Sequence, residues 1–203
     1  MPDTHQVFNQ STPFVDVNLY SADPALREAV TAFAGADAAT HDHLSRLGQR
    51  YGSSQAQQWA QQANANPPVL RSFDRFGHRL DEVEFHPAYH QLMAMALGDG
   101  LHAAPWARPG AGAQVRRAAA YLLFGQLENG VQCPVTMSFA AVPVIARQSQ
   151  LAPDWLPKLL AFDYEGGVAP MQAKRAVTMG MGMTEKQGGS DVRSNTTFAV
   201  AVG

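Results

Sequence analysis

Apolar residues recur every three or four positions along most of the chain, a spacing that places them on one face of a helix. Helix-starting residues support this pattern, as at Asp23-Pro24, where Asp can cap the helix and Pro can take its first position. Together these signals predict helices over residues 23–35, 37–51, 53–65, 86–98, 114–129, 134–149 and 154–162. Residues 69–85 show no single period, and we expect them to form a connector of mixed structure with a turn at 74–77.

The helix predicted over 114–129 is apolar around much of its circumference, so we expect it to lie at the centre of a helical domain. One stripe of this helix is formed by Val115, Ala119, Leu122 and Gln126, and it is widened by Ala118, Leu123 and Leu127.

The period of the pattern changes after Arg175. Residues 177–184 and 196–202 alternate and are rich in Val, Thr and Phe, which predicts strands. The sequence therefore predicts an extended arm over 1–20, a helical domain over 21–170 and the beginning of a β domain over 171–203. Because two lone strands do not form a stable sheet, we expect the rest of that domain to follow Gly203.

Composition narrows the class of protein. The 203 residues carry a net charge of −2, from 15 Lys and Arg against 17 Asp and Glu, so this chain shows no basic excess for nucleic acid or an anionic membrane. A single cysteine, Cys133, excludes an intramolecular disulfide and suits a reducing compartment. The polar N-terminus is unlike a signal peptide, and no apolar run is long enough to cross a bilayer. We therefore expect a soluble, cytoplasmic protein.

The segment 180–195 is the strongest candidate for a binding site. Gly180 and Gly182 alternate with methionines, and the chain then turns through Gly188-Gly189 into Ser190. Bare backbone can lie against a flat ligand, and N–H and hydroxyl groups can meet an anion. A β-bulge followed by an ordinary glycine turn explains the same residues, and both interpretations stay open. The spacing matches neither a Walker A loop nor a dinucleotide-binding turn.

Residues 183–191, Met-Thr-Glu-Lys-Gln-Gly-Gly-Ser-Asp, with Ser194 three positions further on, resemble the signature of the acyl-CoA dehydrogenase family. Every position of that signature is met. The branch of the family associated with the response to DNA alkylation is similar in further stretches, at residues 7–10, 18–20, 66–68, 85–90 and 133–141.

The resemblance implies a mainly α fold class, with the family's N-terminal helical domain followed by the first strands of a β-barrel domain. The family binds FAD between the barrel and a C-terminal helical bundle. By position, the cofactor-binding residues are Met181, Gly182, Met183, Thr184, Glu185, Lys186, Gln187, Gly188, Gly189 and Ser190. In this set Thr184 would address the pyrimidine side of the isoalloxazine and Ser190 the pyrophosphate. Met181 stands where the family usually has Tyr or Phe.

The resemblance also implies partners and limits. The family's proton-abstracting glutamate belongs to the C-terminal domain, so we name no catalytic residue in this chain and expect Glu185 to fix its own loop. Acyl-CoA is the implied substrate, with dehydrogenation weak or vestigial, and the implied assembly is a homotetramer. The alternative is a flavoprotein that binds and protects double-stranded DNA through its C-terminal domain, or an inactive scaffold. We expect residues 1–203 alone to retain no stoichiometric FAD and to show no turnover.

Two other features have simple structural explanations. His86 and His90 have the spacing of metal ligands, but Pro87 places His86 at a helix start, which favours a capping or structural pair over a metal site. Cys133 precedes Pro134 at another helix start, and its apolar neighbours favour a buried, inert thiol over a reactive one.

Overall fold

The computed structural model describes residues 4–202, so residues 1–3 of the expected arm and Gly203 at the end of the expected β domain lie outside the described residues. Its helices are α1 (Pro24–Ala34), α2 (Ala38–Tyr51), α3 (Ser54–Ala65), α4 (Pro87–Gly98), α5 (Ala104–Ala107), α6 (Ala113–Gly125), α7 (Gln132–Ile145) and α8 (Ala152–Leu159). The strands β1 (Val69–Phe73) and β2 (Arg79–Glu84) pair antiparallel. Short 3-10 turns cover Met171–Ala173 and Val192–Ser194. The mainly α fold class is confirmed.

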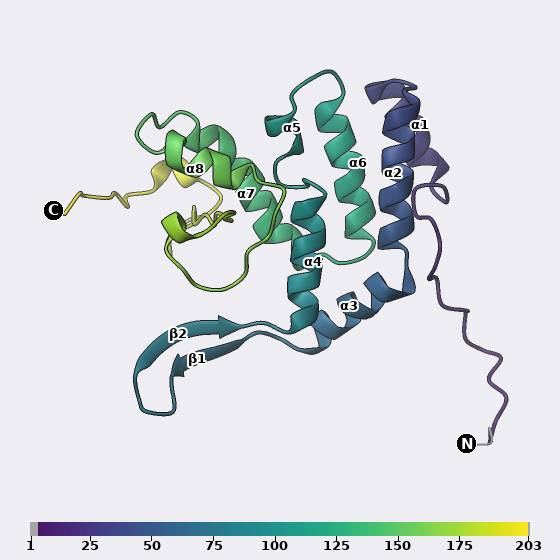
Figure 1. Ribbon diagram of the computed structural model, residues 1–203, viewed down its shortest axis with the longest axis horizontal. Coiled ribbons are helices and arrows are strands. Elements are labelled where there is room, and N and C mark those ends of the chain that lie inside the picture. The colour runs from purple at the N-terminus through teal and green to yellow at the C-terminus, as the bar shows by residue number, and fades with distance from the viewer. Residues whose placement is uncertain (1–3, 203) are drawn as a thin grey trace.

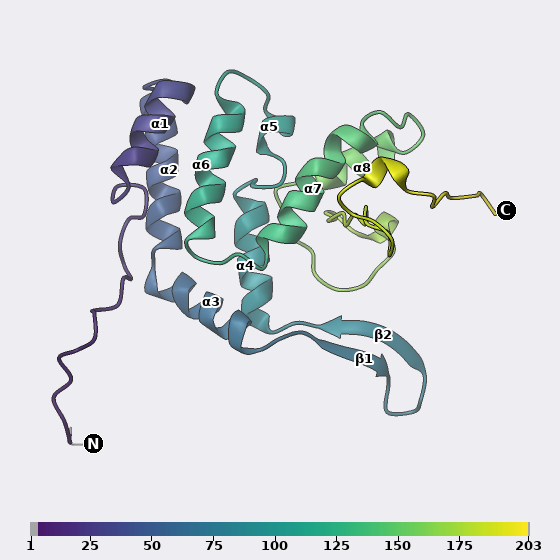
Figure 2. The same ribbon diagram turned by 180° about the vertical axis from the view of Figure 1, so that it is seen from behind.

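The helices form two groups on either side of α4. Figures 1 and 2 show α1, α2 and α6 side by side, with α3 running across one end of this group. The helices α7 and α8 and the C-terminal segment lie on the other side of α4. The β1–β2 hairpin projects away from the body, and the two ends of the described chain leave on opposite sides.

Caps confirm the predicted starts of α1, α2 and α3. The Asp23 carboxylate accepts a hydrogen bond from the Leu26 N–H at 2.9 Å, and the Ser53 hydroxyl accepts one from the Ala56 N–H at 3.2 Å. Asp37 caps α2 in the same way. Each cap satisfies a backbone donor that the first helical turn leaves unpaired, which stabilises a helix by about 1 kcal/mol.

The larger core fills the space between α2, α4 and α6. Tyr51 and Phe124 meet edge to face there, with ring centroids 5.1 Å apart. The Tyr51 hydroxyl donates to Asp99 Oδ2 at 2.6 Å, and Arg50 forms an ion pair with the same carboxylate. Burial raises the pKa of Tyr51 well above its usual value, so the phenol stays protonated. The surrounding fully buried side chains are Leu44, Leu92, Met93, Leu97, Leu101 and Leu123.

A second, smaller cluster joins α7, α8 and the segment that follows them. Its buried members are Val142, Leu159 and Val177, and Trp106, Ile145, Trp155, Leu156, Leu160, Met171 and Met179 pack around them. The helix α7 therefore contributes to both clusters, because Val135 in its first turn belongs to the larger core and Val142 to the smaller cluster. Met179, the residue directly before the candidate binding segment, packs against this smaller cluster.

The central position of α6 is confirmed, but its expected stripe is only partly right, since Ala119, Leu123 and Leu127 are buried as expected. Leu122 is 60% exposed, whereas Ala113, Ala120 and Phe124 are buried. The difference arises because α6 packs against α1 and α2 on one side and α5 on another, which turns the Leu122 position outward.

The strand expectations also need correction. The connector 69–85 is a hairpin whose strand residues are nearly all exposed, and the predicted turn joins its strands through a Gly77 N–H to Asp74 carbonyl bond of 3.1 Å. Within the described residues no strand forms over 177–184 or 196–202. Those residues have the composition of strands, but a strand forms only against a partner, and here the sole pairing is the isolated bridge Glu185–Gly188.

Candidate functional site

The candidate binding segment is held to the helical body just before its first residue. Ser138 lies in the middle of α7 and is fully buried. Its hydroxyl donates to the Pro134 carbonyl at 2.8 Å and accepts from the Met179 N–H at 3.0 Å. One buried side chain therefore fixes the backbone one residue before Gly180.

Lys158 of α8 fixes the chain just before that point. Its ammonium donates to the carbonyls of Met171, Gln172 and Lys174 at 2.8, 3.2 and 2.7 Å. The Lys158 carbonyl in turn accepts from the Val177 N–H at 3.3 Å. This set of bonds closes the loop 171–177 around one cation and directs residue 178 onward along α7.

From Gly180 the backbone runs along the surface and is open to a ligand. A Cβ placed on Gly180 or Gly182 would meet nothing within 4 Å. The intervening Met181 is 44% exposed and Met183 is 57% exposed. Both glycines therefore leave the main chain uncovered, as the interpretation of a cofactor segment requires.

The residues after Thr184 form a tight turn. Glu185 and Gly188 exchange backbone hydrogen bonds of 3.0 and 3.2 Å, with Lys186 and Gln187 exposed at the tip. The Glu185 carboxylate accepts from the Thr197 N–H at 2.6 Å, and hydrogen bonds from the side chain and backbone of Thr197 lower the pKa of Glu185. The carboxylate therefore fixes its own loop, which is the structural role expected for it.

Two hydroxyl groups flank this turn. Thr184 and Ser190 are both exposed, and among residues 4–202 neither side-chain oxygen has a hydrogen-bond partner. A Cβ on Gly189 would lie 3.0 Å from Thr184 Cγ2, so the small residue lets the returning chain approach Thr184. The segment 181–190 thus presents open backbone and two unpartnered hydroxyls, a donor set that suits a flat ring with an attached phosphate.

The structure also places the other candidates from the sequence, His86, His90 and Cys133. His86 caps α4 by accepting from the Ala88 N–H at 3.2 Å, and His90 bonds the Tyr164 hydroxyl at 2.7 Å, so a structural pair is confirmed. Burial raises the pKa of Tyr164 to about 12. No group of three or more potential ligands for a metal ion occurs among the described residues. Cys133 is exposed, and the expectation of a buried thiol was wrong because its position faces outward from α7.

Sequence reasoning missed Ser138 and Lys158, the two residues that position the segment. Ser138 lies within the stretch 133–141 that carries the family resemblance, but the apolar pattern there gave no sign that one polar side chain would turn inward. Lys158 looks like an ordinary surface lysine near the end of a short helix. Neither hydrogen-bonding role follows from the residue type alone.

Comparisons with known proteins identify close relatives. A family model described as the adaptive response protein AidB N-terminal domain matches residues 9–166. The putative acyl-CoA dehydrogenase AidB of Escherichia coli (strain K12) is 46% identical over 200 residues, which are 97% of this chain and 36% of that protein. The acyl-CoA dehydrogenase family member 11 of Caenorhabditis elegans is 27% identical over 172 residues, 78% of this chain and 25% of that protein.

Solved structures share the fold. The structure named Bd2924 apo-form superposes with a TM-score of 0.79 at 29% identity, and the match covers 94% of this chain and 37% of that one. Caenorhabditis elegans ACDH-11 in complex with C11-CoA gives a TM-score of 0.74 at 22% identity, with 96% and 33% covered, a likeness of fold alone. The chain thus spans about a third or less of the length of these relatives. None of the helices over residues 4–202 is both long and apolar enough to span a bilayer.

Proposed function

The chain belongs to the AidB N-terminal domain family of the acyl-CoA dehydrogenases, and we propose that it supplies the helical domain and the first flavin-binding segment of an FAD-containing protein. Residues 21–170 form the helical domain in this proposal, and residues 171–203 open the β domain. The supporting observation is the uncovered backbone at Gly180 and Gly182 beside the unpartnered hydroxyls of Thr184 and Ser190.

Each residue of the segment has a role in this proposal. Met181 to Met183 lay main chain beside the isoalloxazine, Thr184 bonds its pyrimidine edge, and Ser190 and the Gly189 N–H bond the pyrophosphate. FAD, when bound, supplies hydride acceptance, which this chain's residues cannot provide. Ser138 and Lys158 hold the segment in place, and Glu185 keeps the turn between the two hydroxyls closed.

The proposed substrate class is an acyl-CoA, because the relatives are acyl-CoA dehydrogenases and one of them is in complex with C11-CoA. We expect dehydrogenation to be weak. The alternative is a flavoprotein that protects DNA from alkylation without meaningful turnover, as the family resemblance of the sequence implies. Both proposals place the catalytic base and the DNA contacts outside this chain. A homotetramer and a cytoplasmic location stay predictions.

The test of cofactor binding uses the protein extended to the length of its Escherichia coli relative. We expect bound flavin by visible absorbance. A Thr184→Val or Ser190→Ala change should weaken FAD binding by about 1–3 kcal/mol each, because each removes one partner of a hydrogen bond that the bound cofactor would bury. Ser149→Ala alters an exposed serine outside the segment and should leave the affinity unchanged. Parental affinity in both site variants would remove these hydroxyls from the flavin site.

Two further assays separate the alternatives. Dye reduction with acyl-CoA substrates measures dehydrogenation directly. Binding to duplex DNA should weaken steeply as salt rises if a basic surface makes the contacts. Flavin content with no turnover, together with salt-dependent DNA binding, favours the protective protein over the dehydrogenase.

A further inference from the structure

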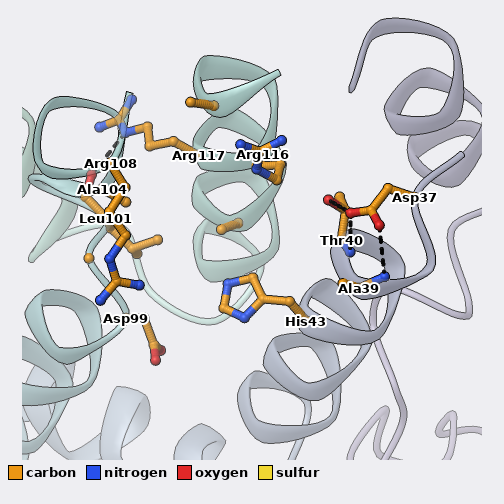
Figure 3. Close-up of a pocket in the computed structure, with 13 residues that line it drawn as sticks. Asp37, Ala39, Thr40, His43, Asp99, Leu101, Ala104, Arg108, Arg116 and Arg117 are labelled. Atoms are coloured by element: carbon orange, nitrogen blue, oxygen red, sulfur yellow. Dashed lines mark hydrogen bonds between the residues drawn. The ribbon is translucent and has the colours of Figure 1, made fainter. Parts of the chain in front are cut away.

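A cavity of about 420 Å³ lies between α2, α5 and α6, well within the size range of small-molecule sites. Figure 3 shows its lining, with Asp37 just before α2, Thr40 and His43 on α2, Arg108 directly after α5, and Arg116 and Arg117 on α6. All of its lining residues come from positions 37–120, so the cavity shares no residue with the segment 181–190.

Arginines line this cavity without carboxylate partners. Among residues 4–202, none of Arg108, Arg116 and Arg117 has an acidic group within ion-pair distance. The Arg108 guanidinium lies over the Phe162 ring, 4.8 Å from its centroid, which leaves its hydrogen-bond donors unused. Arg116 Nη1 donates one hydrogen bond to the Ala111 carbonyl at 3.0 Å, and the other N–H groups of this guanidinium remain available. A guanidinium has five N–H donors, so both side chains retain donors for a ligand.

Arg117 adds a third positive charge to the lining, and its side chain is held in place by several contacts. Its Nε donates to the Leu101 carbonyl at 2.8 Å, and its guanidinium carbon lies 4.3 Å from the Tyr121 ring centroid and 4.1 Å from that of Phe139. Its Nη2 atom is buried and has no hydrogen-bond partner among the described residues. The rings hold this cation at the cavity wall, where its charge acts on whatever the cavity contains.

The carboxylates in the lining are committed to other groups. Asp37 accepts from the Thr40 N–H and hydroxyl, at 3.0 and 2.8 Å, as the cap of α2. Asp99 accepts from Tyr51 and pairs with Arg50, which lies outside the lining. Hydrogen bonds from Thr40 and, to a smaller degree, the charge of Arg116 lower the pKa of Asp37, so this carboxylate keeps its negative charge. Three arginines face two carboxylates in the lining, which leaves a net positive charge.

Two further groups favour an anion. The N-terminus of α6 has no side-chain cap, and its first residue, Ala113, belongs to the lining, so the positive end of the helix dipole lies at the edge of the cavity. His43 lines the opposite side, and burial is the main cause that lowers its pKa. Its imidazole is therefore neutral at pH 7 and can donate one hydrogen bond.

We propose that this cavity binds a small molecule through a phosphate group, with Arg108 and Arg116 as the direct ligands and His43 as a third donor. These groups approach from three different elements (Figure 3), and a tetrahedral phosphate accepts from several directions, whereas a carboxylate offers two oxygens in one plane. The cavity has more room than a free phosphate needs, so the phosphate belongs to a larger ligand.

The test titrates sodium phosphate and adenosine monophosphate separately into the purified protein at its full natural length, by calorimetry and by the shift in melting temperature. Sodium chloride and sodium acetate at matched ionic strength are the reference anions. We expect both phosphates to raise the melting temperature above the chloride control, with the nucleotide binding more tightly. Acetate should behave as chloride does.

The variants locate the binding. Arg108→Gln and Arg116→Gln should each weaken phosphate binding about tenfold, since each removes a charge-assisted hydrogen bond. Arg147→Gln is the matched control, because Arg147 is exposed after α7 and outside the lining. If Arg108→Gln fails to fold, Arg116→Gln decides alone. A phosphate effect no larger than that of chloride, or an equal loss in the Arg147 control, would overturn the proposal.

Discussion

His102 is a buried histidine whose titration should limit the stability of the fold in mild acid. The residue is 1% exposed, its Nε2 hydrogen-bonds the Ala161 carbonyl at 3.0 Å, and its Nδ1 has no partner among the described residues. Burial is the main cause that lowers its pKa from 6.5 to about 4, and the nearby Arg117 acts in the same direction. The folded state therefore favours the neutral form of the His102 imidazole.

The sign of the pH dependence follows from this shift. Above pH 6.5 the imidazole is neutral in both the folded and the unfolded chain, so its titration costs nothing. Between pH 6.5 and about pH 4 the unfolded chain binds a proton that the folded chain refuses, and the free energy of unfolding falls. With 1.36 kcal/mol for each pKa unit, the full loss is about 3 kcal/mol, and it levels off below pH 4.

Urea unfolding measured at intervals from pH 7.5 to pH 4.5 tests this reasoning. His102→Gln keeps an N–H that can reach the Ala161 carbonyl but cannot titrate, so its stability should depend less steeply on pH than that of the parent. The exposed His5 offers the control, because His5→Gln should leave the parental slope unchanged. An identical slope in His102→Gln and the parent would refute the assignment. The pKa of His43 is also lowered by burial, so some slope should persist in His102→Gln.

Two more substitutions test how the chain is held. Ser138→Ala should lower the free energy of unfolding by about 1–3 kcal/mol, because it leaves the Met179 N–H without its partner. The control Ser149→Ala should change that free energy by less than about 0.5 kcal/mol. Equal urea midpoints for the two variants would show that Ser138 does not anchor the chain. Gly52→Ala should cost about 1–3 kcal/mol in thermal unfolding, since its Cβ would lie 1.8 Å from the Val17 carbonyl oxygen. Gly98→Ala, with nothing within 4 Å, should be neutral or stabilising, and a similar loss in both would contradict the packing argument.

The helical domain was largely predictable because its signals are local. Capping residues such as Asp23 and Asp37 mark helix starts by bonding the backbone within three positions, so the sequence contains all the information needed. Which face of a helix is buried depends instead on the neighbours that tertiary packing supplies. For that reason the periodicity placed α6 correctly and oriented Leu122 wrongly.

Strands were less predictable, because their formation depends on a partner as much as on composition. The hairpin at 69–84 was missed although its turn at Asp74 was recognised, since nearly all of its side chains are exposed and no inward face marks the strands. Residues 177–184 have the opposite problem, a strand-like composition with no neighbour to pair with. The candidate segment was found from its glycines and signature, whereas Ser138 and Lys158, which hold it, depend on contacts made across the fold.

The division of the interior into two clusters separates the demands of folding from those of binding. The segment 180–190 continues from the smaller cluster around Leu159, and α7 contributes buried residues to that cluster and to the larger core. Substitutions around Leu159 can therefore retune the geometry offered to a ligand while the bulk of the folding energy, concentrated around Tyr51 and Phe124, stays intact. In a protein that evolves away from its ancestral reaction, residues of the smaller cluster could therefore change while the larger core keeps the helical domain folded.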